Sequence, residues 1–297
     1  MPDFTNCKRL WGYAYNGANG KKLAIKYHGE RYVLKFPSSN CRNLPGCSRP
    51  NSCINEHIAS TIFNMAGISA QETLLGTYTV EGNTEIVCAC KDFTLDGSRL
   101  FDFCSIRNTV LDSSYSGTDT ELEGILDTIR KQQYVDPEEL LRYFWDMFVM
   151  DAFLGNFDRH NGNWGFLYHD DIQSITPAPV YDCGSCLLPQ ADEQVMRMVL
   201  ENPEELDARV YRFPTSSIKQ AGRKINYYDF LMAAANPDCN AAVIRMVPRL
   251  HMDAIRAWNN GVPFLNELQR RFYQKYLAAR LEKILMPAYL QLAEHPS

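Results

Sequence analysis

The residues best suited to catalysis lie in one short polar segment, Gly155-Asn-Phe-Asp-Arg-His-Asn-Gly-Asn163. Asp158 and Asn163 are five positions apart, so a single loop can present both side chains to one substrate. Phosphoryl transfer needs a carboxylate that accepts the proton of the attacking hydroxyl, and oxygen ligands for the magnesium ion that neutralises the phosphates. The segment therefore predicts Asp158 as the base and Asn163 as a metal ligand. A polar turn capped by Asp and Asn is the structural alternative.

Asp182 is a second candidate metal ligand. It follows an apolar segment and precedes Cys183 and Gly184, which matches the D-F-G position of kinases with a cysteine in place of the aromatic residue. Cys183 and Cys186 also form a C-x-x-C pair, a spacing found in zinc and redox sites. We disfavour zinc because no second ligand pair stands at a suitable spacing, and redox because the context is not that of a thioredoxin-like βαβ unit. For Asp182, a simple turn acid is the alternative.

Lys35 is the candidate cation for the phosphates. It follows the apolar residues Val33 and Leu34, and a lysine is costly to bury without a partner. Phosphates, together with a carboxylate on the following helix, would supply partners, and we expect Glu56 to be that carboxylate. An edge-strand lysine facing water is the alternative, and Lys26 on the neighbouring strand is a weaker candidate.

A glycine loop precedes the first predicted hairpin. Its four residues, Gly17, Ala18, Asn19 and Gly20, could let backbone N–H groups approach phosphates closely. The pattern is neither a Walker loop nor G-x-G-x-x-G, so a simple turn is the competing interpretation. The order of the motifs along the chain nevertheless favours a single catalytic site. That order is glycine loop, lysine strand, glutamate helix, D-x-x-x-x-N and D-x-G.

The elements that must position these residues divide the chain near residue 92. Alternating apolar residues predict strands at 22–27, 31–36, 74–79 and 85–90. A helix capped by Ser52 or Asn55 and stopped by Gly67 should lie between the two strand pairs. Residues 1–92 should therefore form a small antiparallel sheet lobe that binds nucleotide.

Residues 93–297 should form a larger, mostly helical catalytic lobe. We expect a capping box at Thr118–Glu121 and a long helix from Asp136 to Leu154. Strands are expected at 164–168 and 178–181, followed by helical stretches near 192–209, 226–237, 239–257 and 264–290. A sheet lobe followed by a helical lobe is an α+β arrangement, and the cleft between them is a natural ligand site.

Composition narrows the function further. Hydrophobic residues make up 45% and charged residues 22% of the 297 residues, which is typical of a globular protein. The formal net charge of −5 disfavours a nucleic-acid partner. No signal peptide and no apolar run of membrane-spanning length is present, so we expect a cytoplasmic protein without a membrane partner, or one exported by a route that uses no signal peptide. The ten cysteines are interpreted as reduced thiols.

The segment Asp158-Arg-His-Asn-Gly-Asn163 resembles the D-R-H-x-x-N motif of two kinase groups, the HipA-like serine/threonine kinases of bacteria and the phosphatidylinositol kinases. The resemblance to the HipA-like group is much closer and extends from about Phe4 to about residue 285. The segments that carry it are Gly17–Gly20, Glu72–Tyr78, Ala89–Thr94, Phe144–Leu167, Asp182–Leu187 and Lys224–Leu231.

This resemblance implies a bilobal protein-kinase-like fold and an ATP- and Mg²⁺-dependent serine/threonine protein kinase. It implies Asp158 as the catalytic residue, with Asn163 and Asp182 as magnesium ligands. The implied ATP site comprises Gly17, Ala18, Asn19, Gly20, Lys35, its partner Glu56, the hinge residues Cys90, Lys91 and Asp92, and His160, Asn163 and Asp182.

The sequence does not identify the protein substrate, and the chain itself is one candidate. Autophosphorylation on a serine is expected, with Ser38, Ser39, Ser48 and Ser52 as the candidates near the cleft. Two alternatives remain open at this point. One is a lipid or small-molecule kinase that uses the same residues, and the other is a catalytically silent pseudokinase that acts as an interaction module.

Overall fold

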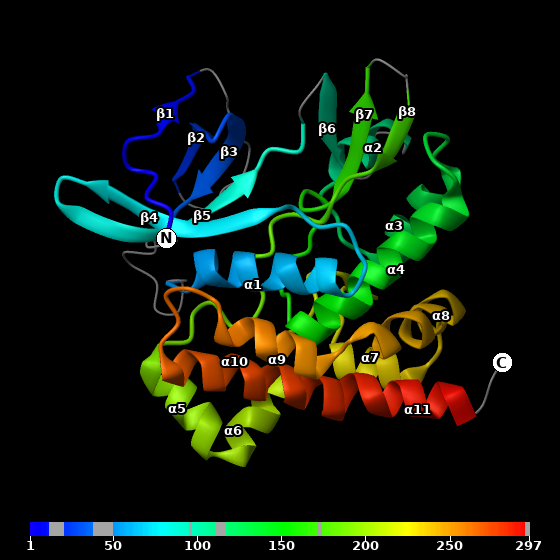
Figure 1. Ribbon diagram of the computed structural model, residues 1–297. Helices are drawn as coiled ribbons and strands as arrows, with labels where there is room; N and C mark the ends of the chain where they lie inside the picture. Colours follow the sequence, from blue (N-terminus) through cyan, green and yellow to red (C-terminus); the bar gives the residue numbers. More distant parts are fainter. Residues whose placement is uncertain (12–20, 38–49, 95–96, 111–116, 171–173, 295–297) are drawn as a thin grey trace.

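The structure is a computed structural model of the 297-residue chain, described for residues 1–11, 21–37, 50–94, 97–110, 117–170 and 174–294 (Figure 1). The predicted glycine loop at 17–20 and the serines at positions 38, 39 and 48 lie outside the described residues. In the described part, no helix combines the length and the apolar character needed to cross a membrane.

An antiparallel sheet forms the first lobe. The hairpin predicted near His28 is present, and His28 and Gly29 both take positive φ values, +46° and +87°. The strands lie in the spatial order β1 (Lys8–Arg9), β2 (Lys22–Tyr27), β3 (Glu30–Lys35), β5 (Asn83–Lys91) and β4 (Thr73–Val80).

Helix α1 (Ser52–Met65) covers one face of this sheet (Figure 1). Its apolar side, with Ile54, Ile58 and Ile62, packs into the main core. The predicted caps are wrong, because Asn51 is the N-cap residue. Asn55 instead lies one turn into the helix, so its side chain does not cap it.

The two faces of β3 are both covered, and this determines where Lys35 points. Leu34 packs into a separate cluster on the far face of the sheet, with Phe4 and Tyr78 among its neighbours. Because side chains alternate along a strand, Val33 and Lys35 face the opposite way, toward α1. The sequence therefore turns Lys35 inward, toward the helix that carries Glu56.

A second sheet, which was not expected as such, stands beside the first lobe. It contains β6 (Ser98–Asp102), β7 (Gly165–His169) and β8 (Ser174–Pro177), in that spatial order. The strand predicted at 178–181 is wrong, because Pro177 and Pro179 lack the N–H groups that would continue the ladder. Val180 makes only an isolated bridge to Ala70. The prediction also missed β6 and α2 (Phe103–Val110).

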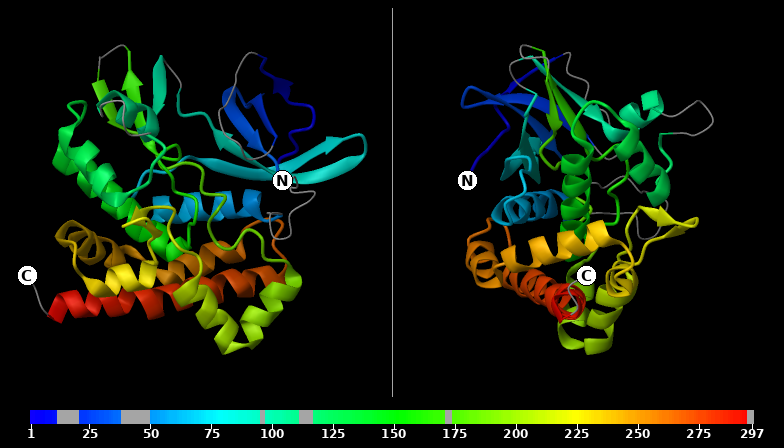
Figure 2. Two further views of the ribbon diagram at one scale, coloured as in Figure 1. Left: turned by 180° about the vertical axis from the view of Figure 1, so that it is seen from behind. Right: turned by 90° about the vertical axis from the view of Figure 1, so that its right-hand side faces the viewer.

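Helices make up most of the remaining chain (Figure 2). α4 is buried along most of its length and begins as predicted, with the Asp136 carboxylate accepting the N–H of Glu138 at 2.8 Å. The described helices after α2 are α3 (Leu122–Lys131), α4 (Pro137–Leu154), α5 (Glu193–Glu201), α6 (Pro203–Asp207), α7 (Tyr227–Ala233), α8 (Pro237–Met246), α9 (Met252–Asn260), α10 (Glu267–Arg280) and α11 (Met286–Glu294). A short hairpin, β9 (Lys219–Gln220) and β10 (Arg223–Lys224), precedes α7.

Prolines explain where the predicted helices break. The stretch expected at 192–209 is divided at Asn202, which caps a new helix with Pro203 at its first position. The stretch expected at 239–257 is interrupted by a 3₁₀ turn containing Pro248. The capping box at Thr118 is also wrong, since α3 begins at Leu122 after Glu121, whose side chain makes no capping bond to the helix.

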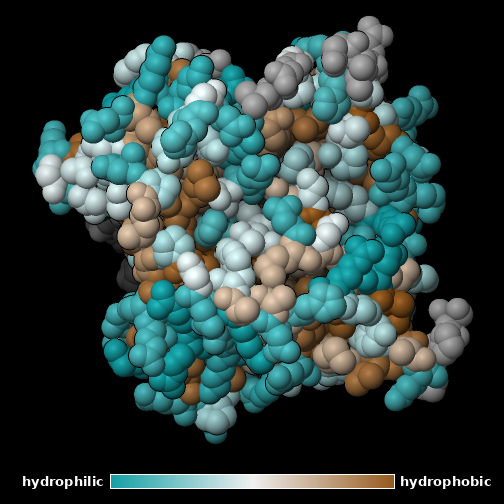
Figure 3. Space-filling view, in the orientation of Figure 1, coloured by the Kyte–Doolittle hydropathy of each residue, from teal (hydrophilic) through white to brown (hydrophobic). Residues whose placement is uncertain are grey.

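The predicted α+β architecture is confirmed: an antiparallel sheet lobe is followed by a mainly helical one. In Figure 1 the sheet of β1–β5 and α1 lie above helices α5–α11, and β6–β8 stand to one side. In the space-filling view, neutral and apolar residues gather across the middle of this face, whereas hydrophilic residues cover much of the lower helices (Figure 3). The division of the chain at residue 92 stays a prediction.

Candidate active site

The polar segment that follows α4 forms a closed loop. Gly155 ends the helix with φ +66°, and a Cβ there would lie 2.3 Å from the Tyr276 hydroxyl, so only glycine fits. The Asn156 side chain accepts the N–H of Asp158 at 3.0 Å, and the Asn163 side chain donates to the Asp158 carbonyl at 2.8 Å. These bonds place Asp158 and Asn163 side by side, as the spacing predicted.

Arg159 is the internal support of this loop. Its guanidinium is almost fully buried and forms an ion pair with Asp151 of α4 at 2.9 Å. It also donates to the carbonyls of Asn163 at 2.7 Å and Tyr181 at 2.5 Å. Burial would lower the pKa of Arg159, but the Asp151 carboxylate together with Cys183 and Cys186 raises it well above its usual value. One side chain thus joins α4, the loop and the segment that leads to Asp182.

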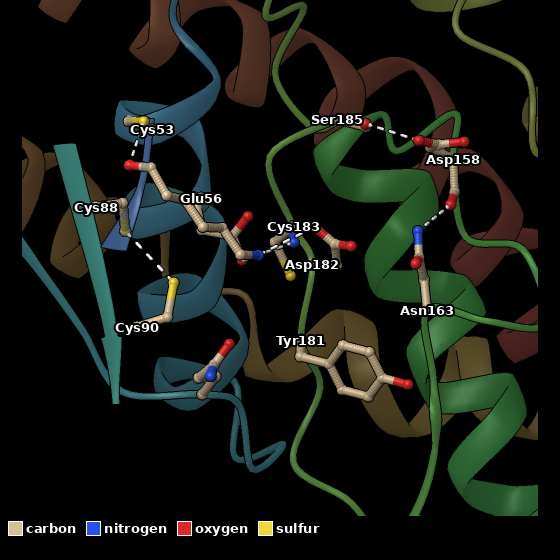
Figure 4. Close-up of polar contacts among 12 residues, drawn as sticks. Cys53, Glu56, Cys88, Cys90, Asp158, Asn163, Tyr181, Asp182, Cys183 and Ser185 are labelled. Atoms are coloured by element: carbon tan, nitrogen blue, oxygen red, sulfur yellow. Dashed lines mark hydrogen bonds and ion pairs between the residues drawn. The ribbon is translucent and has the colours of Figure 1, made fainter. Parts of the chain in front are cut away.

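The orientation of Asn163 suits a metal ligand. Its amide nitrogen is used in the bond to Asp158, which leaves its Oδ1 atom without a hydrogen bond to the described residues. Figure 4 shows Asp182 between Glu56 on one side and the loop of Asp158 and Asn163 on the other. An amide oxygen and a carboxylate are the donors that Mg²⁺ prefers, so the donor chemistry here fits that ion.

Asp182 is held in an unusual backbone conformation beside a cation. Its φ is +58°, and its Oδ1 atom lies 3.0 Å from Lys35 Nζ. Burial would raise the pKa of the Asp182 carboxyl, but Lys35 and then Lys22 outweigh burial and lower the pKa to about 2. The carboxylate is therefore charged at neutral pH. A non-glycine residue with positive φ is strained, and such strain often accompanies function.

Lys35 bridges two carboxylates. Its Nζ lies 3.0 Å from Glu56 Oε1 as well as 3.0 Å from Asp182 Oδ1. Burial would lower the pKa of Lys35, but Asp182 and Glu56 together raise it well above its usual value, so the ammonium keeps its charge. The prediction of Glu56 as the partner of Lys35 agrees with this geometry. Lys26, the weaker candidate, is exposed on β2.

Ser185 approaches the proposed base. Its hydroxyl donates to Asp158 Oδ2 at 3.3 Å, and the serine is buried (Figure 4). The D-x-G segment and the catalytic loop therefore touch at the carboxylate itself. Ser185 was not singled out in the sequence, although it directly follows the D-x-G motif.

The predicted hinge residues end β5. Cys90 is fully buried within the strand. The N–H groups of Lys91 and Asp92 donate to the carbonyls of Glu72 at 2.8 Å and Arg31 at 2.9 Å, and the Asp92 carboxylate also pairs with Arg31. These contacts fix the end of β5 between its two neighbouring strands. Contact of these residues with adenine stays a prediction.

His160 lies at the outer side of the loop. Its ring is exposed, and its Nδ1 atom accepts the N–H of Gly162 at 3.1 Å. In this structure it shapes the turn before Asn163. A direct contact between His160 and ATP stays a prediction.

The cysteines are free thiols among the described residues, including Cys183 and Cys186. Within the same residues, no cluster of three or more His, Cys, Asp or Glu side chains could hold a metal ion. A cavity of about 390 Å³ lies elsewhere on the second lobe, lined by Lys224, Asn226 and Phe230 among others, and none of the predicted site residues lines it.

Comparison with known proteins agrees with this arrangement. The family model of the HipA-like C-terminal domain matches residues 14–250. The serine/threonine-protein kinase CtkA of Helicobacter pylori strain J99 is 44% identical over 98% of this chain and 89% of that protein. The crystal structure of the H. pylori proinflammatory kinase CtkA superposes with a TM-score of 0.91 at 43% identity, covering 100% of this chain and 99% of that chain.

A more distant structure shares the fold alone. HipA from the toxin–antitoxin complex of Shewanella oneidensis MR-1 matches with a TM-score of 0.55 at 14% identity, over 95% of this chain and 70% of that chain. The family match covers most of the chain, so the predicted resemblance to the HipA-like serine/threonine kinases is confirmed. The chain belongs to the HipA-like C-terminal domain family and is a serine/threonine protein kinase of that family.

Proposed function

We propose that this kinase transfers the γ-phosphoryl group of ATP to a serine or threonine hydroxyl through Asp158, Lys35, Asn163 and Asp182. A protein kinase uses ATP, and the observation that carries the assignment of roles is the position of Lys35. Its ammonium lies 3.0 Å from a carboxylate on α1 and 3.0 Å from the aspartate of the D-x-G segment. Kinases require this lysine–glutamate pair and the aspartate to be in place together.

Lys35 and Asp158 have different tasks in this proposal. Lys35 neutralises phosphate charge, and its bond to Glu56 fixes where that charge lies. Asp158 accepts the proton of the acceptor hydroxyl, and its backbone is held by Asn156 and Asn163. The loop is thus ordered before substrate arrives, which lowers the cost of reaching the reactive geometry.

Magnesium is the metal that the donors fit. Asn163 Oδ1 and the Asp182 carboxylate would hold it, since both are oxygen donors and the carboxylate is charged at neutral pH. When bound, the ion supplies charge neutralisation at the phosphates. The ion pair between Lys35 and Asp182 holds this carboxylate beside the ammonium group that would bind the phosphates.

The candidate acceptor serines lie close in sequence to α1. The Ser38–Ser52 region, the candidate site of autophosphorylation, leads into α1, the helix that carries Glu56, and ends at its first residue. Of the four candidate serines, Ser52 is described, and it is the first residue of α1. Dependence on a separate protein substrate would leave the roles of Lys35 and Asp158 unchanged.

Intact-mass measurement after incubation with Mg-ATP tests the proposal. Wild-type protein should gain about 80 Da per phosphoryl group transferred, and Asp158→Asn should lose at least about 10²-fold in rate, the range for losing a general base. Asp158→Asn should keep its affinity for ATP. Equal rates for the two proteins, on the chain itself or on a panel of protein substrates, would contradict the role of Asp158.

A further inference from the structure

Helix α1 is attached to the second lobe at its N-terminal end. The N–H of Asn51 donates to the Pro189 carbonyl at 3.2 Å, and its side chain donates to the Ala191 carbonyl at 2.6 Å. Asn51 is also the N-cap of α1, so the first turn of the helix is fixed to the segment that follows the D-x-G motif. Asn55 and Glu56, which follow in the first two turns of α1, are both fully buried.

Asn55 provides a second and deeper attachment. It is fully buried and directly precedes Glu56. Its amide nitrogen donates to the Cys186 carbonyl at 2.8 Å, and its amide oxygen accepts the hydroxyl of Tyr273 at 2.8 Å. Tyr273 is itself fully buried and comes from α10, 218 residues away in sequence. Both ends of the Asn55 amide are therefore used, one by the D-x-G segment and one by the second lobe.

The same segment is held to α1 at a third point. The N–H of Cys183 donates to Glu56 Oε1 at 3.0 Å (Figure 4). A Cβ on Gly184 would lie 3.1 Å from Glu56 Oε2 and 3.2 Å from the Ser52 carbonyl, so the backbone of this segment packs directly on the helix. Helix α1 and residues 182–191 thus form one hydrogen-bonded unit seated on α10.

We propose that Asn55 and Tyr273 are positioning residues that hold Glu56 and the D-x-G segment together, so that the Lys35–Glu56 pair forms without a regulated movement of α1. The inference rests on the proposed roles of Lys35 and Asp182. Buried polar groups joined in a complete network specify one arrangement, because every alternative leaves a donor or acceptor unpaired. In this kinase the lysine–glutamate pair is a fixed property of the fold.

The test compares two tyrosines on one helix. Tyr273→Phe removes only the hydroxyl that bonds Asn55. Tyr276→Phe is the matched control, since Tyr276 is equally buried on α10 and, among the described residues, its hydroxyl makes no hydrogen bond to α1 or to the D-x-G segment. The proteins compared are wild type, Tyr273→Phe, Tyr276→Phe, Asn55→Ala and the Asn55→Ala/Tyr273→Phe double variant. For each we measure KM for MgATP, kcat, the thermal midpoint and amide hydrogen exchange.

Tyr273→Phe should lower kcat/KM for MgATP about 5-fold, the effect of losing one neutral buried hydrogen bond. Exchange should rise together in residues 53–58 and 183–191, and Tyr276→Phe should change neither readout. The double variant should be no worse than Asn55→Ala alone, because both substitutions remove the same bond. A lower thermal midpoint with unchanged kinetics and unchanged exchange in these two segments would overturn the inference, and so would an equal effect from Tyr276→Phe.

The exchange readout separates this inference from the proposed function. If wild type neither bound MgATP nor transferred phosphate, the proposed function would fail, while the coupled exchange of the two segments would still show whether Tyr273 holds α1. If wild type were active and Tyr273→Phe matched it in every readout, the positioning role alone would be refuted.

Discussion

The Oε1 atom of Glu56 accepts the backbone N–H of Cys183 at 3.0 Å while it lies 3.0 Å from Lys35 Nζ. One carboxylate oxygen therefore links β3, α1 and the D-x-G segment. A movement of Glu56 would therefore deprive both Lys35 and the backbone N–H beside Asp182 of the same acceptor. Changes to this small set of atoms should consequently affect nucleotide binding and fold stability together.

Lys35→Met should weaken MgATP binding by roughly 10- to 100-fold, the range expected for losing a charge-assisted hydrogen bond of about 1.5–3 kcal/mol. The substitution also leaves Glu56 and Asp182 without the cation between them. Calorimetric titration with MgATP measures the change. Lys26→Met on β2 is the matched control, because its side chain is exposed, and it should bind as wild type does. Equal affinities for the two variants would contradict the role of Lys35.

Gly184→Ala should destabilise the protein by about 1–3 kcal/mol, the usual cost of overpacking. The added methyl group would lie 3.1 Å from Glu56 Oε2 and 3.2 Å from the Ser52 carbonyl, so either the carboxylate or the start of α1 must shift. Because Glu56 lies on α1, either shift changes its position relative to Lys35, and kcat should fall as well. Urea unfolding and steady-state kinetics report the two effects.

Gly261→Ala provides the control for that experiment. A Cβ at Gly261 would lie 3.4 Å from the Trp258 carbonyl, an ordinary contact, and its φ of −91° suits alanine. This variant should keep wild-type stability and activity. A Gly184→Ala protein as stable and as active as Gly261→Ala would show that α1 and the D-x-G segment are not packed as closely as described.

The parts of the site that are local in sequence were predictable. Asp158 and Asn163 share one loop, and their five-residue spacing predicts their adjacency. Lys35 was recognisable because a lysine in an apolar strand requires a partner. Its inward direction follows from strand alternation, which Leu34 and the far-face core confirm.

The supporting residues were not predictable, because their roles depend on contacts between distant segments. Asn55 seemed to be a helix cap, since Asn is favoured there, but its partners lie 131 and 218 residues away. Arg159 was visible as the arginine of D-R-H, yet nothing local shows that it is buried against Asp151. The second sheet escaped prediction because β6 pairs with β7 across more than 60 intervening residues.

Asp182→Asn should lose the metal dependence of nucleotide binding. The amide has no negative charge for Mg²⁺, whereas Lys35 retains Glu56 as a partner and can still bind phosphates. Titration with ATP in the presence of Mg²⁺ and in the presence of EDTA measures this dependence. Wild type should bind more tightly with Mg²⁺, and the variant should bind similarly in both conditions. A variant with the wild-type difference between the two conditions would show that Asp182 is not a ligand.

Asp182 should also make stability depend on pH in the acid range. Its pKa is about 2 in the folded protein against an ordinary 3.8, because Lys35 and Lys22 outweigh burial. A carboxyl with a lowered folded pKa contributes stability above its unfolded pKa and loses it as pH falls toward the folded pKa. At about 1.4 kcal/mol per pKa unit, the contribution at pH 7 is about 2 kcal/mol, and roughly half of it should be lost by pH 3.

Urea unfolding of wild type and Asp182→Asn at pH 7, 5 and 3 measures this contribution. The difference in unfolding free energy should be the same at pH 7 and pH 5, because both lie above the unfolded pKa, and it should shrink by about 1 kcal/mol at pH 3. Lys35 cannot produce that pattern, because its pKa is raised in the folded protein. Its contribution to the unfolding free energy is therefore lost only as pH rises above about 10.5. A constant difference down to pH 3 would mean that Asp182 gains nothing from Lys35 in the folded state, contrary to their 3.0 Å separation.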